Sequence, residues 1–184
     1  MSNKSKFLMS KKEGGFVDVS FFGVLISIAI LTAAGFITYR VMVSDAYSTV
    51  LISGHRLVVK SVRENYRHSA TFVGLSNTVA NAANYAPESW ETSATAITNN
   101  VNGAVTIAPT TCNSVTNGCF TVTHAGLDVG LCNDFVGNEF PAANAITVGS
   151  TTVKATATTA INPGTIATAC NNATNSVAIQ YAKS

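Results

Sequence analysis

Four cysteines have the clearest chemistry in this sequence: Cys112, Cys119, Cys132 and Cys170. Thiols form disulfides or bind a metal such as zinc. Zinc sites use closely spaced ligand pairs such as C-x-x-C, and the sequence contains no such pair. Disulfides are therefore predicted, and four cysteines allow three pairings. We expect no metal and no cofactor.

The three histidines are the candidates for acid–base chemistry. His55 and His68 lie in a segment predicted to be helical, where exposed or interface positions are expected. His124 ends a predicted strand near Asp128 and Asp134, but no Ser or Cys nucleophile signature accompanies it. The sequence also lacks a Gly-rich phosphate loop and a paired-carboxylate pattern. We therefore predict that the chain is not an enzyme.

Four basic residues recur at intervals of about four and form one stripe along the predicted helix: Arg56, Lys60, Arg63 and Arg67. Such a stripe could bind DNA phosphates or face the acidic surface of a neighbouring copy. Packing against a neighbour is the favoured interpretation, because ion pairs across such contacts set register more than affinity.

A long apolar segment near the N-terminus precedes the cysteines, the histidines and the basic stripe. Residues 19–39 contain no charge and as a helix would be about 32 Å long, close to the hydrocarbon thickness of a bilayer. Basic residues precede this run, which predicts membrane insertion with the N-terminus in the cytoplasm. A cleaved secretory signal is the alternative, with Ser44-Asp45-Ala46 as a loose cleavage site. The apolar run is too long for one, and Arg40 interrupts the approach.

The helical pattern continues beyond the apolar run. Residues 44–69 contain no Pro and one Gly, and apolar residues recur there at helical spacing: Val50, Leu57, Val58, Val62 and Tyr66. One continuous helix over about 16–66 is predicted. Its first half is apolar on all sides and its second half is amphipathic.

The residues that follow the long helix are predicted to form a globular head. Its strand candidates are 103–108, 119–124, 145–148, 151–157 and 176–182. A short helix is expected over 72–83 and another around Leu127, Leu131 and Phe135, with a tight turn at Gly149-Ser150 and an exposed edge strand and loop over 151–169. Strands grouped after one long helix imply an α+β fold, with an antiparallel sheet packed on the amphipathic half of the helix.

Composition and charge narrow the function classes. Hydrophobic residues make up 47% of the chain and charged residues only 11%, which excludes a disordered chain and argues against a highly charged nucleic-acid binder. The net charge of +2 hides a gradient: residues 1–15 carry +3, from four Lys and one Glu, and residues 40–68 also carry +3, from five basic and two acidic side chains. Beyond residue 70, two Lys and five acids give −3. This pattern indicates a leader, a stem and a head.

The N-terminus resembles a type IV prepilin. A Lys-rich leader ends in Gly14-Gly15, and Phe16 and the apolar helix follow at once. The resemblance implies that a prepilin peptidase cuts between Gly15 and Phe16 and that the new Phe16 amine is N-methylated. The stretches CFTVTHAGLDVGLCNDFV and ACNNATNSVAIQYAKS resemble the type IVb group, which includes conjugative, bundle-forming and toxin-coregulated pilins.

This resemblance also implies a division of the chain and a disulfide pairing. Residues 1–15 are the cleaved leader, 16–43 the transmembrane and polymerisation half of the helix, and 44–184 the head with the amphipathic half. Related pilins join a helix-borne cysteine to one just before the last strand, which implies Cys132–Cys170. The remaining pair, Cys112–Cys119, would close a small surface loop around Asn117-Gly118.

One position departs from the pilin pattern. Most such pilins have Glu at the fifth mature position, where this sequence has Ser20. The nearest acid is Asp18, at the third position, and two residues turn a helix by about 200°. An unpaired acid beside an apolar run is costly, so we assign the assembly contact to Asp18.

The function implied is that of a structural subunit, the major pilin of a type IVb pilus (fimbrium), which forms a homopolymer. The implied partners are other copies of the chain, the prepilin peptidase, the assembly platform and its ATPase. The precursor would lie in the inner membrane and the product in an extracellular pilus. The alternatives are a minor or tip pilin that binds a surface receptor or DNA, and a pseudopilin of a secretion system. The sequence does not distinguish conjugation, cell adhesion and motility.

Overall fold

The computed structural model describes the backbone of residues 19–183 and the side chains of residues 24–32 and 45–183. It divides into two compact units, Met1–Val41 and Met42–Ser184, and we call the second unit the head. Helix α1 (Val19–Asn65) contributes residues to both units. The long helix expected over 16–66 is confirmed over its described part, whereas Gly15, Phe16 and Asp18 lie outside the described residues.

The large described side chains of the first unit are apolar and exposed. Their exposed fractions run from 46% at Leu25 to 72% at Leu31. The one hydroxyl at the end of this stretch, on Thr32, donates to the Ile28 carbonyl at 2.6 Å, which satisfies it within the helix. Within the part of the chain that the structure describes, no helix is both long and apolar enough to cross a membrane.

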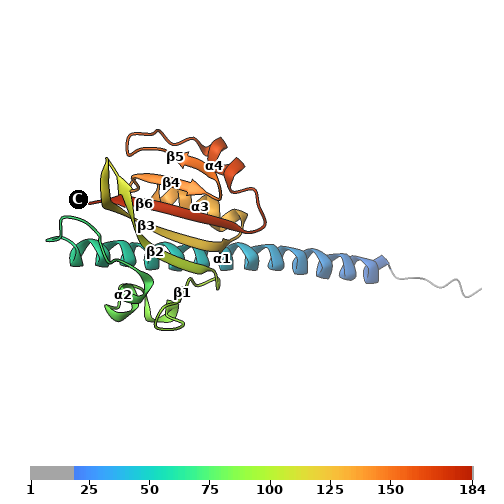
Figure 1. Cartoon of the computed structure of the whole chain (residues 1–184). Helices are drawn as coiled ribbons and strands as arrows, with labels where there is room; N and C mark the ends of the chain where they lie inside the picture. The colour runs from blue at the N-terminus through green and yellow to red at the C-terminus, as the bar shows by residue number, and fades with distance from the viewer. Residues whose placement is uncertain (1–18, 184) are drawn as a thin grey trace, which may run out of the picture. The chain divides into compact units, whose positions relative to one another are not determined.

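An antiparallel sheet forms the centre of the head (Figure 1). Its strand order is β1-β2-β3-β6-β4-β5, and the strands are β1 (Ile97–Thr98), β2 (Ala104–Cys112), β3 (Val115–Leu127), β4 (Ala145–Val148), β5 (Thr151–Lys154) and β6 (Asn175–Ala182). Residues Phe120 and Val122 of β3 lie opposite Tyr181 and Ile179 of β6. All four are fully buried, so these alternating residues form one buried face. The expected α+β fold is confirmed.

Three short helices complete the head together with one 3-10 turn: α2 (Asn77–Ala82), η1 (Glu88–Trp90), α3 (Val129–Glu139) and α4 (Pro163–Ala169). Helix α2 is shorter than the 72–83 expected, because the Ser76 hydroxyl caps it by accepting from the Val79 amide. The edge strand expected within 151–169 is present as β5, but helix α4 corrects the expectation of loop at the end of this stretch. Asn162 caps its start and Pro163 occupies its first turn, and these are standard helix-start signals.

The buried face of α1 differs from the predicted one. Val50 and Leu57 are 49% and 45% exposed. Val58 and Val62 are buried as predicted, but Leu51 and His55 complete the buried face in place of Val50 and Leu57. The face is rotated because His55, a polar residue that we expected to be exposed, has partners inside the head.

Two disulfides join parts of the head, in the same pairs that the pilin resemblance implies. Cys132–Cys170 connects α3 to the end of α4, whereas Cys112–Cys119 connects β2 to β3. The loop-entropy relation gives contributions of about 4 and about 2.5 kcal/mol, respectively. The expected loop around Asn117-Gly118 is corrected, since the hairpin turns at Asn113-Ser114, where both residues have positive φ, and Asn117-Gly118 lies within β3.

Gly54 of α1 packs closely against the Trp90 ring. A Cβ at this position would lie 2.8 Å from Trp90 Cη2 and 3.0 Å from Cε2. We predict that Gly54→Ala lowers the free energy of unfolding by about 1–3 kcal/mol through overpacking, despite the roughly 1 kcal/mol gained in helix propensity. Denaturant unfolding of the full chain in detergent measures this.

Gly137→Ala is the matched control, because no atom lies within 4 Å of its added Cβ in α3. It is expected to leave stability unchanged or to raise it by up to about 1 kcal/mol. Equal effects of the two substitutions would contradict the packing argument.

Candidate functional site

A chain of hydrogen bonds runs through the buried centre of the head. His124 Nε2 and His55 Nδ1 lie 3.0 Å apart, and His55 Nε2 lies 2.6 Å from the Tyr181 hydroxyl. That hydroxyl donates to Glu139 Oε2 at 2.9 Å. The four side chains come from β3, α1, β6 and α3, and we call them the histidine network. It connects every layer of the head through polar contacts.

The carboxylate at one end sets the direction of the hydrogen bonds. Because Tyr181 donates its proton to Glu139, its oxygen must accept a proton from His55 Nε2. His55 Nδ1 then carries no proton and accepts from His124 Nε2. Both imidazoles are therefore neutral Nε2–H tautomers, and the remaining acceptor is His124 Nδ1, which has no hydrogen-bond partner among the described residues.

Burial keeps these groups uncharged. Desolvation lowers the pKa of His124 to about 3. Desolvation, followed by the nearby His124 and Arg56, lowers the pKa of His55 well below its usual value. Desolvation and then the Glu139 carboxylate raise the pKa of Tyr181. The network holds its protons in one arrangement across the ordinary pH range.

An arginine compensates the buried carboxylate. The Glu139 side chain is only 2% exposed, and Arg56 Nε donates to its Oε1 at 2.8 Å. Each carboxylate oxygen therefore has one donor, from Arg56 or from Tyr181. A buried carboxylate that loses such a partner costs about 3–5 kcal/mol, so the two donors tie α1 and β6 to α3.

Aromatic rings surround the two imidazoles. The Phe135 ring meets His55 and His124 edge-on, at centroid distances of 4.9 and 5.0 Å. Trp90 meets His124 in the same way at 5.5 Å. Neither imidazole has any exposed surface, whereas Glu139 and Tyr181 at the other end of the network line an open pocket of about 350 Å³.

The structure corrects the expected roles of the histidines and of part of the basic stripe. His55 is buried rather than exposed, and His124 contacts His55 rather than Asp128, which caps α3 by accepting from the Leu131 amide at 2.8 Å. Two members of the stripe form contacts within the head of the same chain. Arg56 binds Glu139, and Arg63 donates to the Ala182 carbonyl at 3.3 Å and lies over the Tyr181 ring.

The other members of the stripe, Lys60 and Arg67, are exposed. All four cysteines are in disulfides, so none is a metal ligand. Among the described residues, no group of three His, Cys, Asp or Glu side chains could hold a metal ion.

The sequence analysis missed two residues of this site. Glu139 follows Leu131 and Phe135 at the same four-residue spacing, so the pattern already placed an acid on the buried face of α3. Trp90 had no such signal, because η1 is too short to show a period. Its burial at 1% exposed depends on the path of the chain between α2 and β1.

The comparisons with known proteins agree with this architecture. A protein-family model described as "PilS N terminal" matches residues 44–182. The chain belongs to the PilS N-terminal family. A search of curated proteins found no match.

Two solved structures resemble this PilS-family chain in fold. A type IVb pilin from Salmonella typhi has 13% identity and a TM-score of 0.56, over 72% of this chain and 97% of that one. TcpA, a type IV pilin from the El Tor biotype of Vibrio cholerae, has 16% identity and a TM-score of 0.56, over 74% and 99%. The resemblance of this PilS-family chain to type IVb pilins is thereby confirmed in its fold.

The histidine network makes the stability of the head depend on pH. Below pH 6.5 the unfolded chain binds protons at both histidines, whereas the folded head binds them only at much lower pH. The free energy of unfolding should therefore fall with falling pH, by about 4 kcal/mol from pH 7 to pH 5. Chemical denaturation at a series of pH values measures this loss.

His124→Gln removes one titrating group and keeps a donor for His55. It should reduce the pH-dependent loss to about 2 kcal/mol. His68→Gln is the control, because His68 is exposed, and it should leave the loss unchanged. Equal stability of the unsubstituted chain at pH 7 and pH 5 would contradict the assignment of neutral, buried imidazoles.

Proposed function

We propose that this chain is the major subunit of a type IVb pilus, which assembles through its apolar N-terminal helix after leader cleavage. The observation that carries the proposal is the PilS family match over a head of pilin fold, joined to an apolar helical segment. Val24, Ile28 and Leu31 of that segment are more than half exposed in the single chain. Such a surface is stable only in lipid or against other apolar helices.

The precursor is held in the inner membrane by residues 19–39, with residues 1–15 in the cytoplasm. Support comes from the uncharged length of this run and from the four Lys that precede it. Peptidase cleavage between Gly15 and Phe16 keeps the apolar helix in the mature protein. Helix-to-helix contacts then replace lipid contacts, so that packing and register select the filament.

Asp18 provides the assembly contact in place of the usual Glu. Cleavage before Phe16 creates an amine two residues from Asp18, and a neighbouring copy presents the same amine. An ion pair with that amine would neutralise both charges where the surroundings are apolar. The assembly platform and ATPase extract each subunit for this step.

Abundance separates the major pilin from the alternatives. A minor or tip pilin, which would bind a receptor or DNA, would be rare along the fibre. A secretion-system pseudopilin would more often have a smaller head or an acidic calcium-type cluster, and neither pattern is evident in the sequence.

Intact-mass and N-terminal analysis of filaments sheared from cells tests the proposal. The predominant chain should begin at N-methylated Phe16. Without reduction it should be four hydrogens lighter than after reduction, because two disulfides are present. A soluble chain that begins at Tyr47 would overturn the proposal, since it would indicate a secretory signal and a secreted binding domain.

Asp18→Asn tests the assembly contact separately. Loss of the charge should lower surface filaments by about tenfold or more, since a partner lost from a buried ion pair costs more than ~1.4 kcal/mol. Leader cleavage and precursor level should stay normal. Ser20→Ala is the control at the fifth mature position and should assemble normally. Quantitative immunoblotting of sheared fractions measures the filament yield of both variants. Equal yields would refute the role of Asp18.

A further inference from the structure

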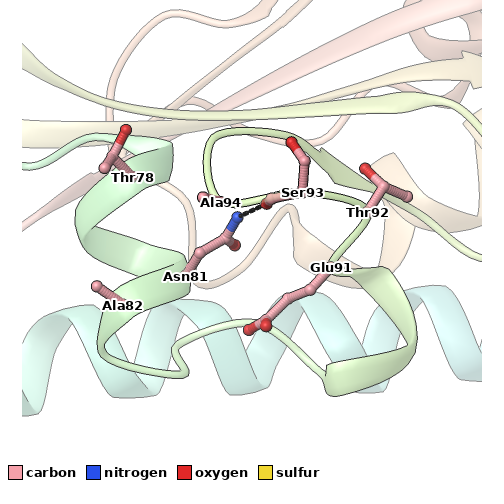
Figure 2. A pocket seen from close by; sticks show the side chains of 7 residues that line it. All are labelled: Thr78, Asn81, Ala82, Glu91, Thr92, Ser93 and Ala94. Atoms are coloured by element: carbon pink, nitrogen blue, oxygen red, sulfur yellow. Dashed lines mark hydrogen bonds between the residues drawn. The ribbon is translucent and has the colours of Figure 1, made fainter.

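An open polar pocket lies between α2 and the segment that leads into β1. Its volume is about 440 Å³, and it is lined by Thr78, Asn81, Ala82, Glu91, Thr92, Ser93 and Ala94. Figure 2 shows Asn81 extending from α2 toward Ser93, with the Glu91 side chain below it in this view. We call it the α2 pocket.

Two polar groups of the α2 pocket, the Asn81 side-chain carbonyl and the Glu91 carboxylate, are acceptors. Asn81 is 8% exposed, and its amide nitrogen donates to the Ser93 carbonyl at 2.6 Å. Its Oδ1 has no hydrogen-bond partner among the described residues and points toward the Glu91 side of the pocket in Figure 2. The Glu91 carboxylate forms no ion pair with a described residue. A ligand that approaches the Glu91 carboxylate must therefore donate hydrogen bonds.

The charge around the α2 pocket favours a cation as the hydrogen-bond donor. The sequence contains no Lys or Arg between Arg67 and Lys154. Glu91 lies in this interval and lines the pocket, and no residue of α1 lines it. The pocket is thus electronegative, and an ammonium group, with three donors and no acceptor, fits its chemistry.

Most basic side chains of the head already have a partner within the same chain: Arg56, Arg63, Arg67, Lys154 and Lys183. Lys60 differs from them. Its side chain is 70% exposed, and its one ion-pair partner, Glu64, is 3.8 Å away and itself 62% exposed. Lys60 is therefore an exposed ammonium group that forms no hydrogen bond shorter than 3.5 Å within the described part of the head.

We propose that the α2 pocket receives Lys60 from a second copy of this chain, with its ammonium group against Glu91. The inference rests on the proposed function, because it requires copies to pack side by side. The pocket and Lys60 are different surfaces, so the contact is heterologous and can be repeated along a filament. An exposed pair of this kind sets register more than affinity.

Charge reversal in the full chain tests the contact. Glu91→Lys or Lys60→Glu should lower the fraction of subunits in filaments by about five- to tenfold at low ionic strength, since like charges then face each other. The double variant should restore it to within about twofold. Glu88→Lys is the matched control, because it makes the same charge change three residues away, outside the pocket lining.

Zero-length cross-linking provides a second readout. Carbodiimide joins the Lys60 amine to the Glu91 carboxyl with loss of water, and a mixture of isotope-labelled and unlabelled chains distinguishes intermolecular products. The expected result is a mixed-isotope Lys60–Glu91 peptide, absent from Glu91→Gln. No such peptide in filaments, no restoration in the double variant, or equal effects of Glu91→Lys and Glu88→Lys would overturn the contact.

The cross-link also separates this inference from the proposed function. A chain that forms no filaments contradicts the proposed function. A mixed-isotope peptide in its detergent-solubilised oligomers would still support the contact, and its absence there would overturn it.

Discussion

A carboxylate held out of water constrains the head more than any other single group. Glu139 is stable at 2% exposure because Arg56 and Tyr181 each donate to one of its oxygens. Tyr181 in turn fixes the proton on His55, and His55 fixes the proton on His124. The position of α1 on the sheet, the orientation of α3 and the pairing of β3 with β6 must all agree for these bonds to form. A buried polar chain of this kind selects one packing arrangement, whereas apolar contacts alone tolerate several.

Each disulfide joins an element that carries a residue of the histidine network to one that carries none. Cys132–Cys170 ties α3 to α4, and Cys112–Cys119 braces the β2–β3 hairpin near its turn. The histidine network and the disulfides therefore stabilise different contacts. Polar contacts orient α1 against the sheet, and covalent links limit the freedom of the outer segments.

Sequence patterns predicted the elements that have their own periodicity. The continuous helix, the alternation along β3 and β6, the turn at Gly149-Ser150 and the helix around Leu131 and Phe135 all follow from local spacing. The errors fall where local spacing is ambiguous. Val50 and Leu57 fit a helical period as well as the true buried face does, and only the partners of His55 decide between the two. Helix α4 was missed because its Thr- and Ala-rich sequence suits an exposed strand equally well.

The sequence by itself determined the apolar helix, the α+β class and the membership of a pilin-like group, because each depends on composition, on short motifs or on repeating patterns. Only the tertiary structure decided which polar groups are buried together. His55, His124, Glu139 and Tyr181 are up to 126 residues apart in sequence, and no local pattern encodes the pairing of such distant side chains. The same holds for the α2 pocket, whose Asn81 and Glu91 come together only when α2 packs beside the start of β1. Burial and unmatched hydrogen-bonding groups are properties of the packed chain, so they become visible only once the fold is complete.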